Sequence, residues 1–91
     1  MIVIEVSRAA KIKNENNMDK EIKKFNDYHK HLSYQYYIEL VLGESNELDE
    51  IRESIIYNSG TFMKLKRGDY KINFWFYDID SGKLQDSEEV L

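Results

Sequence analysis

Cysteine is absent from this sequence of 91 residues, which rules out disulfide bonds, thiolate nucleophiles and thiolate metal sites together. Long apolar runs are absent too, since none approaches the roughly 18 to 20 residues that a membrane-spanning helix needs. The opening stretch, MIVIEVSR, has neither the basic region nor the small-residue cleavage site of a signal peptide. These absences predict a cytoplasmic protein that does not bind a membrane.

Patterns that carry catalysis or metal binding are also scarce. The four glycines are isolated, so no glycine-rich phosphate loop exists, and no serine stands in a nucleophile elbow. The two histidines, His29 and His31, point about 200° apart if they lie on a helix, which prevents chelation of one metal ion. We therefore predict a protein that is not an enzyme and that needs no metal or other cofactor.

What remains is the composition of one folded domain over residues 1–91. Hydrophobic residues make up 42% and charged residues 33%, which is near the average for globular proteins. A chain of this length buries one small core and has no room for a deep cleft between domains.

The spacing of apolar residues predicts alternating strands and helices. In chain order the prediction is a strand at 2–7, a loop at 9–17, a helix at 18–32 with Asn17 as its N-cap, a strand at 34–42, a helix at 46–60, strands at 62–67 and 70–79, and a short strand from 83. A single long helix over 18–42 is the alternative. The predicted fold is a single small α+β domain, roughly βαβαββ(β), with a mostly antiparallel sheet packed against two helices.

Three local features make this prediction specific. The helix at 46–60 has Leu48, Ile51 and Ile55 on its inner face and Gly60 as its terminator. The pair Gly68-Asp69 is typical of a two-residue hairpin turn. A second turn at 80–82 is expected to hold its glycine in the left-handed conformation.

One stretch, FWFYDIDSGK at 74–83, has the form of a catalytic motif. An apolar strand that runs into Asp78-Ile79-Asp80 and then a serine resembles the nucleophile loop of haloacid-dehalogenase-type phosphotransferases. Only thirteen residues follow Asp78, whereas that fold needs a much longer chain after its motif. We therefore interpret Asp78 and Asp80 as turn residues that provide surface charge.

Charge is distributed unevenly along the chain. The net charge is −4 overall, but residues 31–60 hold one basic and six acidic residues. Acidic surfaces keep proteins off nucleic acid and steer them toward basic partners. The predicted partner-binding acids are Glu39, Glu44, Glu47, Asp49, Glu50 and Glu53.

Aromatic residues make up 13% of the chain, and the predicted strand at 70–79 has them on both faces. A strand that is apolar on both faces is either covered on both or leaves one face for a partner. Trp75 and Tyr77, with Tyr37, are therefore predicted to form an exposed patch that binds a partner. In the alternative, one helix packs on each face and these residues belong to the core.

These observations favour a non-enzymatic, acidic protein-binding module. In size, charge and lack of catalytic residues the chain resembles the small phage-encoded inhibitors of host defence, such as anti-CRISPR or anti-restriction proteins. That resemblance implies a viral protein that acts in the host cytoplasm as a nucleic-acid mimic. Its partner would be a protein with a basic surface, such as a nuclease or a nucleoprotein complex, and a homodimer is compatible with the same pattern.

A nucleic-acid-binding or regulatory protein is the alternative. Residues 8–30 carry basic side chains next to aromatic ones, a combination that suits single-stranded nucleic acid. The residues of this basic segment are Arg8, Lys11, Lys13, Lys20, Lys23, Lys24 and Lys30, together with Tyr28 and His29. Acids within the same segment and the overall negative charge argue against it.

Overall fold

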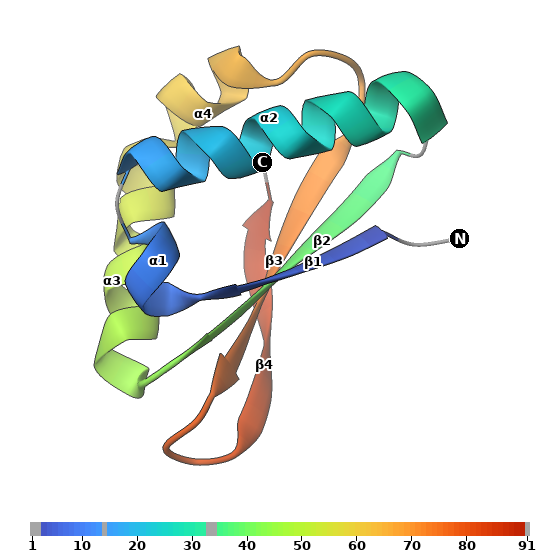
Figure 1. Ribbon diagram of the computed structural model, residues 1–91. Coiled ribbons are helices and arrows are strands. Elements are labelled where there is room, and N and C mark those ends of the chain that lie inside the picture. The colour runs from blue at the N-terminus through green and yellow to red at the C-terminus, as the bar shows by residue number, and fades with distance from the viewer. Residues whose placement is uncertain (1–2, 14, 33–34, 91) are drawn as a thin grey trace.

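The computed structural model describes residues 3–13, 15–32 and 35–90, and these form a four-stranded sheet with helices on one side (Figure 1). The elements are β1 (Val3–Arg8), α1 (Ala9–Ile12), α2 (Glu15–Leu32), β2 (Tyr36–Gly43), α3 (Ser45–Tyr57), α4 (Ser59–Leu65), β3 (Lys71–Asp78) and β4 (Lys83–Val90). The predicted α+β class is confirmed. Among the described residues, no helix combines the length and the apolar character needed to cross a membrane.

The sheet is mixed, with the strand order β1-β2-β3-β4. β1 pairs with β2 and β2 with β3 in parallel, and only β3 and β4 are antiparallel. The predicted mostly antiparallel sheet needs correction on this point. The reason is that helices connect the first three strands, and a helical crossover returns the chain in the same direction.

All the described helices cover the same face of the sheet. The two crossovers, β1 to β2 and β2 to β3, step in the same direction across the sheet, and crossovers of one hand then place their helices on one face. Rings on α2 and on the strands confirm the contact, because Phe25 packs against Tyr37 at 5.5 Å between centroids. The opposite side of the sheet, which we call the open face, carries no helix formed by the described residues (Figure 1).

The hydrophobic core lies between the helices and the covered face. Leu48, Ile51 and Ile55 are buried on α3, as the sequence predicted. They meet Phe74 and Phe76 of β3 and the other buried residues of the core, which include Ile22, Phe25, Tyr37, Val41, Phe62, Tyr70 and Ile72. The Arg52 guanidinium, on the same helix, lies 4.5 Å from the centre of the Phe76 ring.

Helix boundaries depart from the prediction in the first half of the chain. The predicted loop at 9–17 contains α1 and the first turn of α2, and Asn17 is not an N-cap but donates from Nδ2 to the Lys11 carbonyl at 2.5 Å. The alternative of one helix over 18–42 is wrong, because α2 ends at Leu32 and β2 begins at Tyr36. α3 has Glu44 as its N-cap instead of the expected Asn46, and it ends at Tyr57, so Gly60 is not its terminator but lies within α4.

The predicted hairpin around Gly68-Asp69 is also wrong. Residues 59–65 form α4, with Phe62 buried, and β3 pairs with β2 instead of with the segment before it. Gly68 nevertheless needs to be glycine, since its φ is 117° and a Cβ there would lie 2.5 Å from the His29 ring. Glycine is thus required at position 68 by the close approach of a loop to α2, and not by a hairpin turn.

Two glycine-to-alanine substitutions should therefore have opposite effects on stability. Gly68→Ala should lower the free energy of unfolding by about 1–3 kcal/mol, because alanine strains the backbone and displaces His29. Gly60→Ala should raise it by up to about 1 kcal/mol, since Gly60 lies in α4 with open space around its Cα. Urea denaturation of both variants measures the difference, and a Gly68→Ala variant as stable as Gly60→Ala would contradict the close approach.

Candidate functional site

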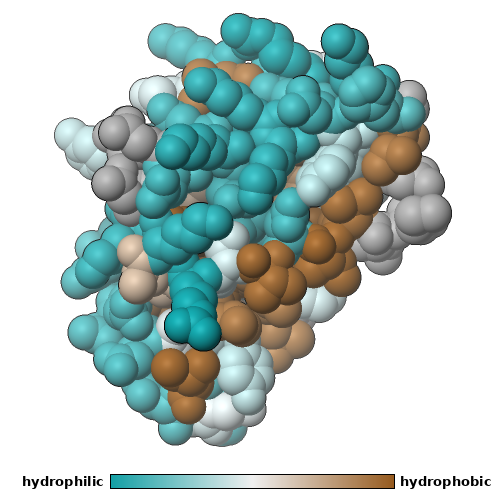
Figure 2. Space-filling view, viewed as in Figure 1, coloured by the Kyte–Doolittle hydropathy of each residue, from teal (hydrophilic) through white to brown (hydrophobic). Residues whose placement is uncertain are grey.

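The open face is formed by alternate residues of the four strands, because successive side chains of a strand point to opposite faces. The register aligns Val6, Leu40, Trp75 and Asp86 in one row across the four strands. The next row aligns Leu42, Tyr77 and Leu84. The described side chains of this face are Ile4, Val6, Arg8, Tyr36, Ile38, Leu40, Leu42, Lys71, Asn73, Trp75, Tyr77 and Leu84. Figure 2 shows a continuous hydrophobic band over the strands, on the side that the helices leave uncovered.

Large apolar side chains on this face remain in contact with solvent. Ile4, Val6, Tyr36 and Leu84 are each more than half exposed, although they are hydrophobic or aromatic. Contiguous apolar patches above a few hundred Å² are rare on monomeric proteins and commonly mark interaction sites. The open face is therefore the strongest candidate for an interaction surface.

Two of the predicted aromatic residues lie on this face and one does not. Trp75 and Tyr77 are both half-buried on β3, with Leu40 and Leu42 beside them on β2. Tyr37 is fully buried on the covered face, where its ring lies 5.2 Å from that of Tyr70. The prediction that Tyr37 belongs to an exposed patch is wrong, because its position in β2 has the opposite parity to Trp75 in the register.

At one end, the open face continues into a hollow of about 430 Å³. Arg8 and Leu42 belong to both, and the remaining lining residues are Ala10, Gly43, Glu47 and Ile79. The hollow lies where β1, β2 and β3 end, and its floor is mainly apolar. It is of a size to receive an apolar side chain from a partner.

The predicted acidic residues lie on α3, on the opposite side of the sheet from Trp75. Glu44, Asp49, Glu50 and Glu53 are exposed and Glu47 is half-buried; we call these five residues the acidic surface of α3. Glu44 and Glu47 also form a capping box, in which the Glu47 carboxylate accepts the Glu44 N–H and the Glu44 carboxylate accepts the Glu47 N–H. The structure thus separates most of the predicted acids from the predicted aromatics, and only Glu47 among these five also lines the hollow at the end of the open face.

Glu39 does not belong to either surface. Its side chain is 0% exposed, on the covered face of β2 beneath α2. The prediction that Glu39 is a partner-binding acid is wrong because its parity in the strand directs it into the core with Tyr37 and Val41.

Around Glu39 lies a buried acidic cluster, formed by Glu5 on β1, Glu39 on β2 and Glu21 on α2. Glu5 and Glu39 are register partners, and Glu21 is 2% exposed. Lys24 Nζ lies 3.3 Å from the Glu21 carboxylate and 3.9 Å from that of Glu5, while the Tyr28 hydroxyl donates to Glu5 at 2.6 Å. Lys24 is thus the cation of a site with three carboxyl groups.

Burial raises the pKa of Glu39 to about 8, and the Glu21 and Glu5 carboxylates add to the rise while the Ser7 hydroxyl opposes it. Neither Glu39 oxygen has a partner of ordinary hydrogen-bond geometry among the described residues. The folded protein therefore holds a neutral Glu39 at pH 7. Sequence analysis missed this cluster, because a glutamate inside an apolar strand was assigned to the surface.

Asp78 is engaged in structure and does not provide surface charge. It is 5% exposed, and one carboxylate oxygen accepts the Ser45 hydroxyl at 2.6 Å while the other accepts the Asp80 N–H at 2.9 Å. The Ser45 hydrogen bond holds the pKa of Asp78 below its usual value. The predicted turn at 80–82 is confirmed, with Gly82 at φ 68° and its N–H donating to the Asp78 carbonyl.

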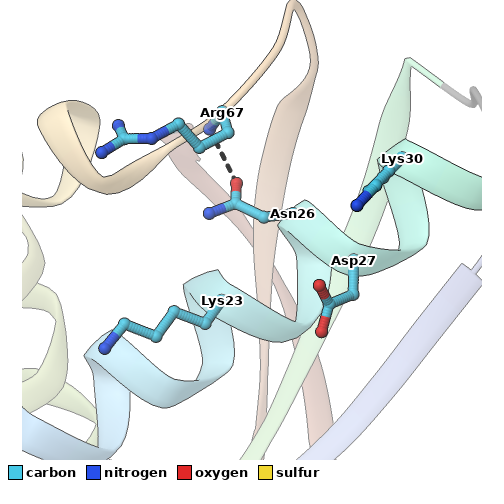
Figure 3. A pocket seen from close by; sticks show the side chains of 5 residues that line it. All are labelled: Lys23, Asn26, Asp27, Lys30 and Arg67. Atoms are coloured by element: carbon cyan, nitrogen blue, oxygen red, sulfur yellow. Dashed lines mark hydrogen bonds between the residues drawn. The ribbon is translucent and has the colours of Figure 1, made fainter.

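A groove of about 640 Å³ runs between α2 and the loop before β3 (Figure 3). Lys23, Lys30 and Arg67 line it together with Asp27, and Asn26 joins its two walls. Asn26 Oδ1 accepts the Arg67 N–H at 2.8 Å, the dashed line in Figure 3, while its Nδ2 donates to the Leu65 carbonyl. Only part of the predicted basic segment gathers here.

The aromatic residues of the basic segment point away from this groove. Tyr28 binds Glu5 in the buried cluster, and the His29 ring packs 4.8 Å from that of Tyr70. Arg8 lies on the open face, and Lys24 lies beside the acidic cluster. The groove therefore offers cations without the stacking surfaces that single-stranded nucleic acid requires.

Within the part of the chain that the structure describes, no group of three histidine, aspartate or glutamate side chains is placed to hold a metal ion. Comparison of the chain with protein-family models, with curated proteins and with solved structures finds no match. The functional argument therefore starts from the surfaces described above.

Proposed function

We propose that this protein is a non-enzymatic protein-binding module that docks through its open face. The observation that carries the proposal is the apolar band on that face, with Trp75 and Tyr77 among its aliphatic residues. Tryptophan and tyrosine are the residue types that most often anchor protein interfaces. The hollow at the end of the face adds a place for a partner's side chain.

The polar clusters support a binding role over a catalytic one. Asp78 is held by Ser45 and by the backbone of its own turn, and Glu5 is held by Tyr28. Groups engaged in this way stabilise the fold and are not presented to a substrate. A partner with a basic surface and a resemblance to phage inhibitors remain predictions from the sequence. A basic partner would bind through the acidic surface of α3.

Nucleic-acid binding remains the second candidate, because the groove of Figure 3 brings Lys23, Lys30 and Arg67 to one site. We rank it lower because Tyr28 and His29 face inward. A labelled single-stranded oligonucleotide tests it by fluorescence anisotropy. Binding that weakens steeply with salt and is lost in Lys30→Glu would move this candidate ahead of protein binding.

We expect Trp75→Ala to weaken binding of the protein partner by roughly 30-fold, because a tryptophan anchor typically contributes about 2 kcal/mol. The loss should be nearly independent of salt, since it arises from apolar contact. The measurement is retention of a protein by the immobilised chain from an extract of the native host, treated with nuclease, followed by titration of the purified partner. Thermal melting of Trp75→Ala shows whether the variant remains folded.

Two control variants assign the effect to a surface. Ile56→Lys changes an exposed apolar residue on α3, and it should leave binding unchanged. A triple variant, Asp49→Lys with Glu50→Lys and Glu53→Lys, reverses exposed charges of the acidic surface of α3 that lie outside the hollow. If this variant loses the partner in a salt-dependent way while Trp75→Ala retains it, docking occurs through α3 and the open-face proposal is wrong.

A further inference from the structure

We propose that the partner of the open face is a second copy of this chain, so that two sheets pack face to face with their helices outside. This inference rests on the proposed function, because it names the occupant of the same surface. Sheets commonly pack in this way at about 10 Å, with the side chains of the two inner faces interdigitating. The area of the face supports a second copy, and neither its cations at the two ends nor the acids of α3 oppose one.

The area of the open face matches a small reversible interface. Strands lie about 4.8 Å apart and rise about 3.3 Å per residue, so four strands of this length span on the order of 400 Å² in flat projection. Side chains add to the accessible area, and a pair of faces would bury on the order of 1,000 Å² in total, the lower limit for specific interfaces. We therefore expect a dissociation constant in the micromolar range.

The charged residues among the described side chains of the open face lie at its two ends. Among the described side chains of the face these are Arg8 and Lys71, and the register also places Asp86 of β4 beside Trp75. The register places Arg8 beside Leu42 and Lys71 beside Tyr36, so the two cations stand about 20 Å apart along the strands. The two cations therefore lie at opposite ends of the face, as the charged rim of an interface does, and long cationic side chains there reach solvent.

The acidic residues do not oppose such a pairing. Each copy carries a net charge of −4, but the acidic surface of α3 lies on the far side of the sheet. In a face-to-face pair these two surfaces point outward, with two sheets and two helix layers between them. That separation exceeds the Debye length of about 8–10 Å at physiological ionic strength, so their repulsion is screened.

Trp75 provides a probe of the open face that needs no label. It is the single tryptophan of the chain, and it is half-buried on this face. If a second copy covers the face, its emission should shift to the blue and become less accessible to acrylamide as concentration rises. Sedimentation velocity on the same samples, from about 1 to about 500 µM, brackets a micromolar dissociation constant. The mass should rise from 10.9 kDa toward twice that value.

Matched variants assign the pairing to the open face. Val6→Lys with Leu84→Lys places charges on two strands of the face at positions that are 57% and 51% exposed, so the fold should tolerate them. We expect this variant to raise the dissociation constant at least about tenfold and to abolish the shift in Trp75 emission. Ile56→Lys, at an α3 position that is 58% exposed, should dimerise like the parent protein.

A mass of 10.9 kDa across the whole range, with constant Trp75 emission, would overturn the second copy as occupant. Retention of another protein that depends on Trp75 would then still support the proposed function. A dimer that survives Val6→Lys with Leu84→Lys but is lost in Ile56→Lys would overturn the inference as well. Growth into species larger than a dimer would contradict a two-fold pairing of open faces.

Discussion

Ile55→Asp should unfold the protein at room temperature, whereas Ile56→Asp should melt close to the parent. Ile55 is 1% exposed in the core and its neighbour Ile56 is 58% exposed on the outside of α3. A carboxylate at position 55 would be buried without a partner, a change that costs at least about 4 kcal/mol. A domain this small lies toward the lower end of the usual range of about 5–15 kcal/mol, so the loss removes most of its stability.

Circular dichroism during thermal and urea denaturation measures this difference directly. Both variants introduce the same residue into the same helix, so helix propensity and net charge change equally. Ile51→Asp, at a second buried position, should behave like Ile55→Asp. If Ile55→Asp and Ile56→Asp melt together, α3 does not bury the face described here.

Glu39→Gln should remove a pH dependence of stability that the parent protein has. The pKa of Glu39 is about 8 in the folded state, against 4.5 ordinarily, so between these values only the folded protein holds the proton. The contribution of the Glu39 proton to the free energy of unfolding is complete below pH 4.5 and is lost as the pH rises toward about 8. The free energy of unfolding falls by up to about 1.4 kcal/mol per pH unit in this range, so the total decrease is roughly 3–5 kcal/mol.

Urea denaturation at a series of pH values from about 5 to about 9 tests this result. Glutamine is neutral at every pH, so the stability of the Glu39→Gln variant relative to the parent should increase as the pH rises. Glu50→Gln, at an exposed position on α3, serves as the control and should keep the slope of the parent. The other charged groups at the site are Glu5, Glu21 and Lys24. An unchanged slope in Glu39→Gln would show that Glu39 does not carry the proton.

Helical periodicity predicted α3 well, and strand alternation predicted the faces of β2 poorly. In α3 the inner residues recur every three or four positions, and only one face of a helix on a sheet satisfies that spacing. β2 is central in the sheet and apolar on both parities, so its pattern does not identify the covered face. Glu39 therefore resembled a surface acid in the sequence, and the buried cluster depends on contacts with Glu5 and Glu21 from distant parts of the chain.

The segment at 59–70 shows a second reason why prediction from the sequence fails. Phe62 and Leu65 fit a short helix as well as a strand, and Gly68-Asp69 favoured a hairpin. Tertiary contacts decide between them, since Asn26 on α2 binds the Leu65 carbonyl and the Arg67 N–H. The sequence predicted Trp75 and Tyr77 as an exposed pair, but the open face around them could not be predicted before the crossovers placed all the helices on one side.

The strand order β1-β2-β3-β4 follows the order in which the ribosome makes the chain. Each strand pairs only with its predecessor and its successor, so no strand has to enter between two that have already paired. We expect the sheet to grow from β1 during synthesis, one βα unit at a time, with β4 adding through a tight turn at the end. The growing sheet always has an unpaired edge strand, and the next strand to be synthesised pairs with the strand made just before it.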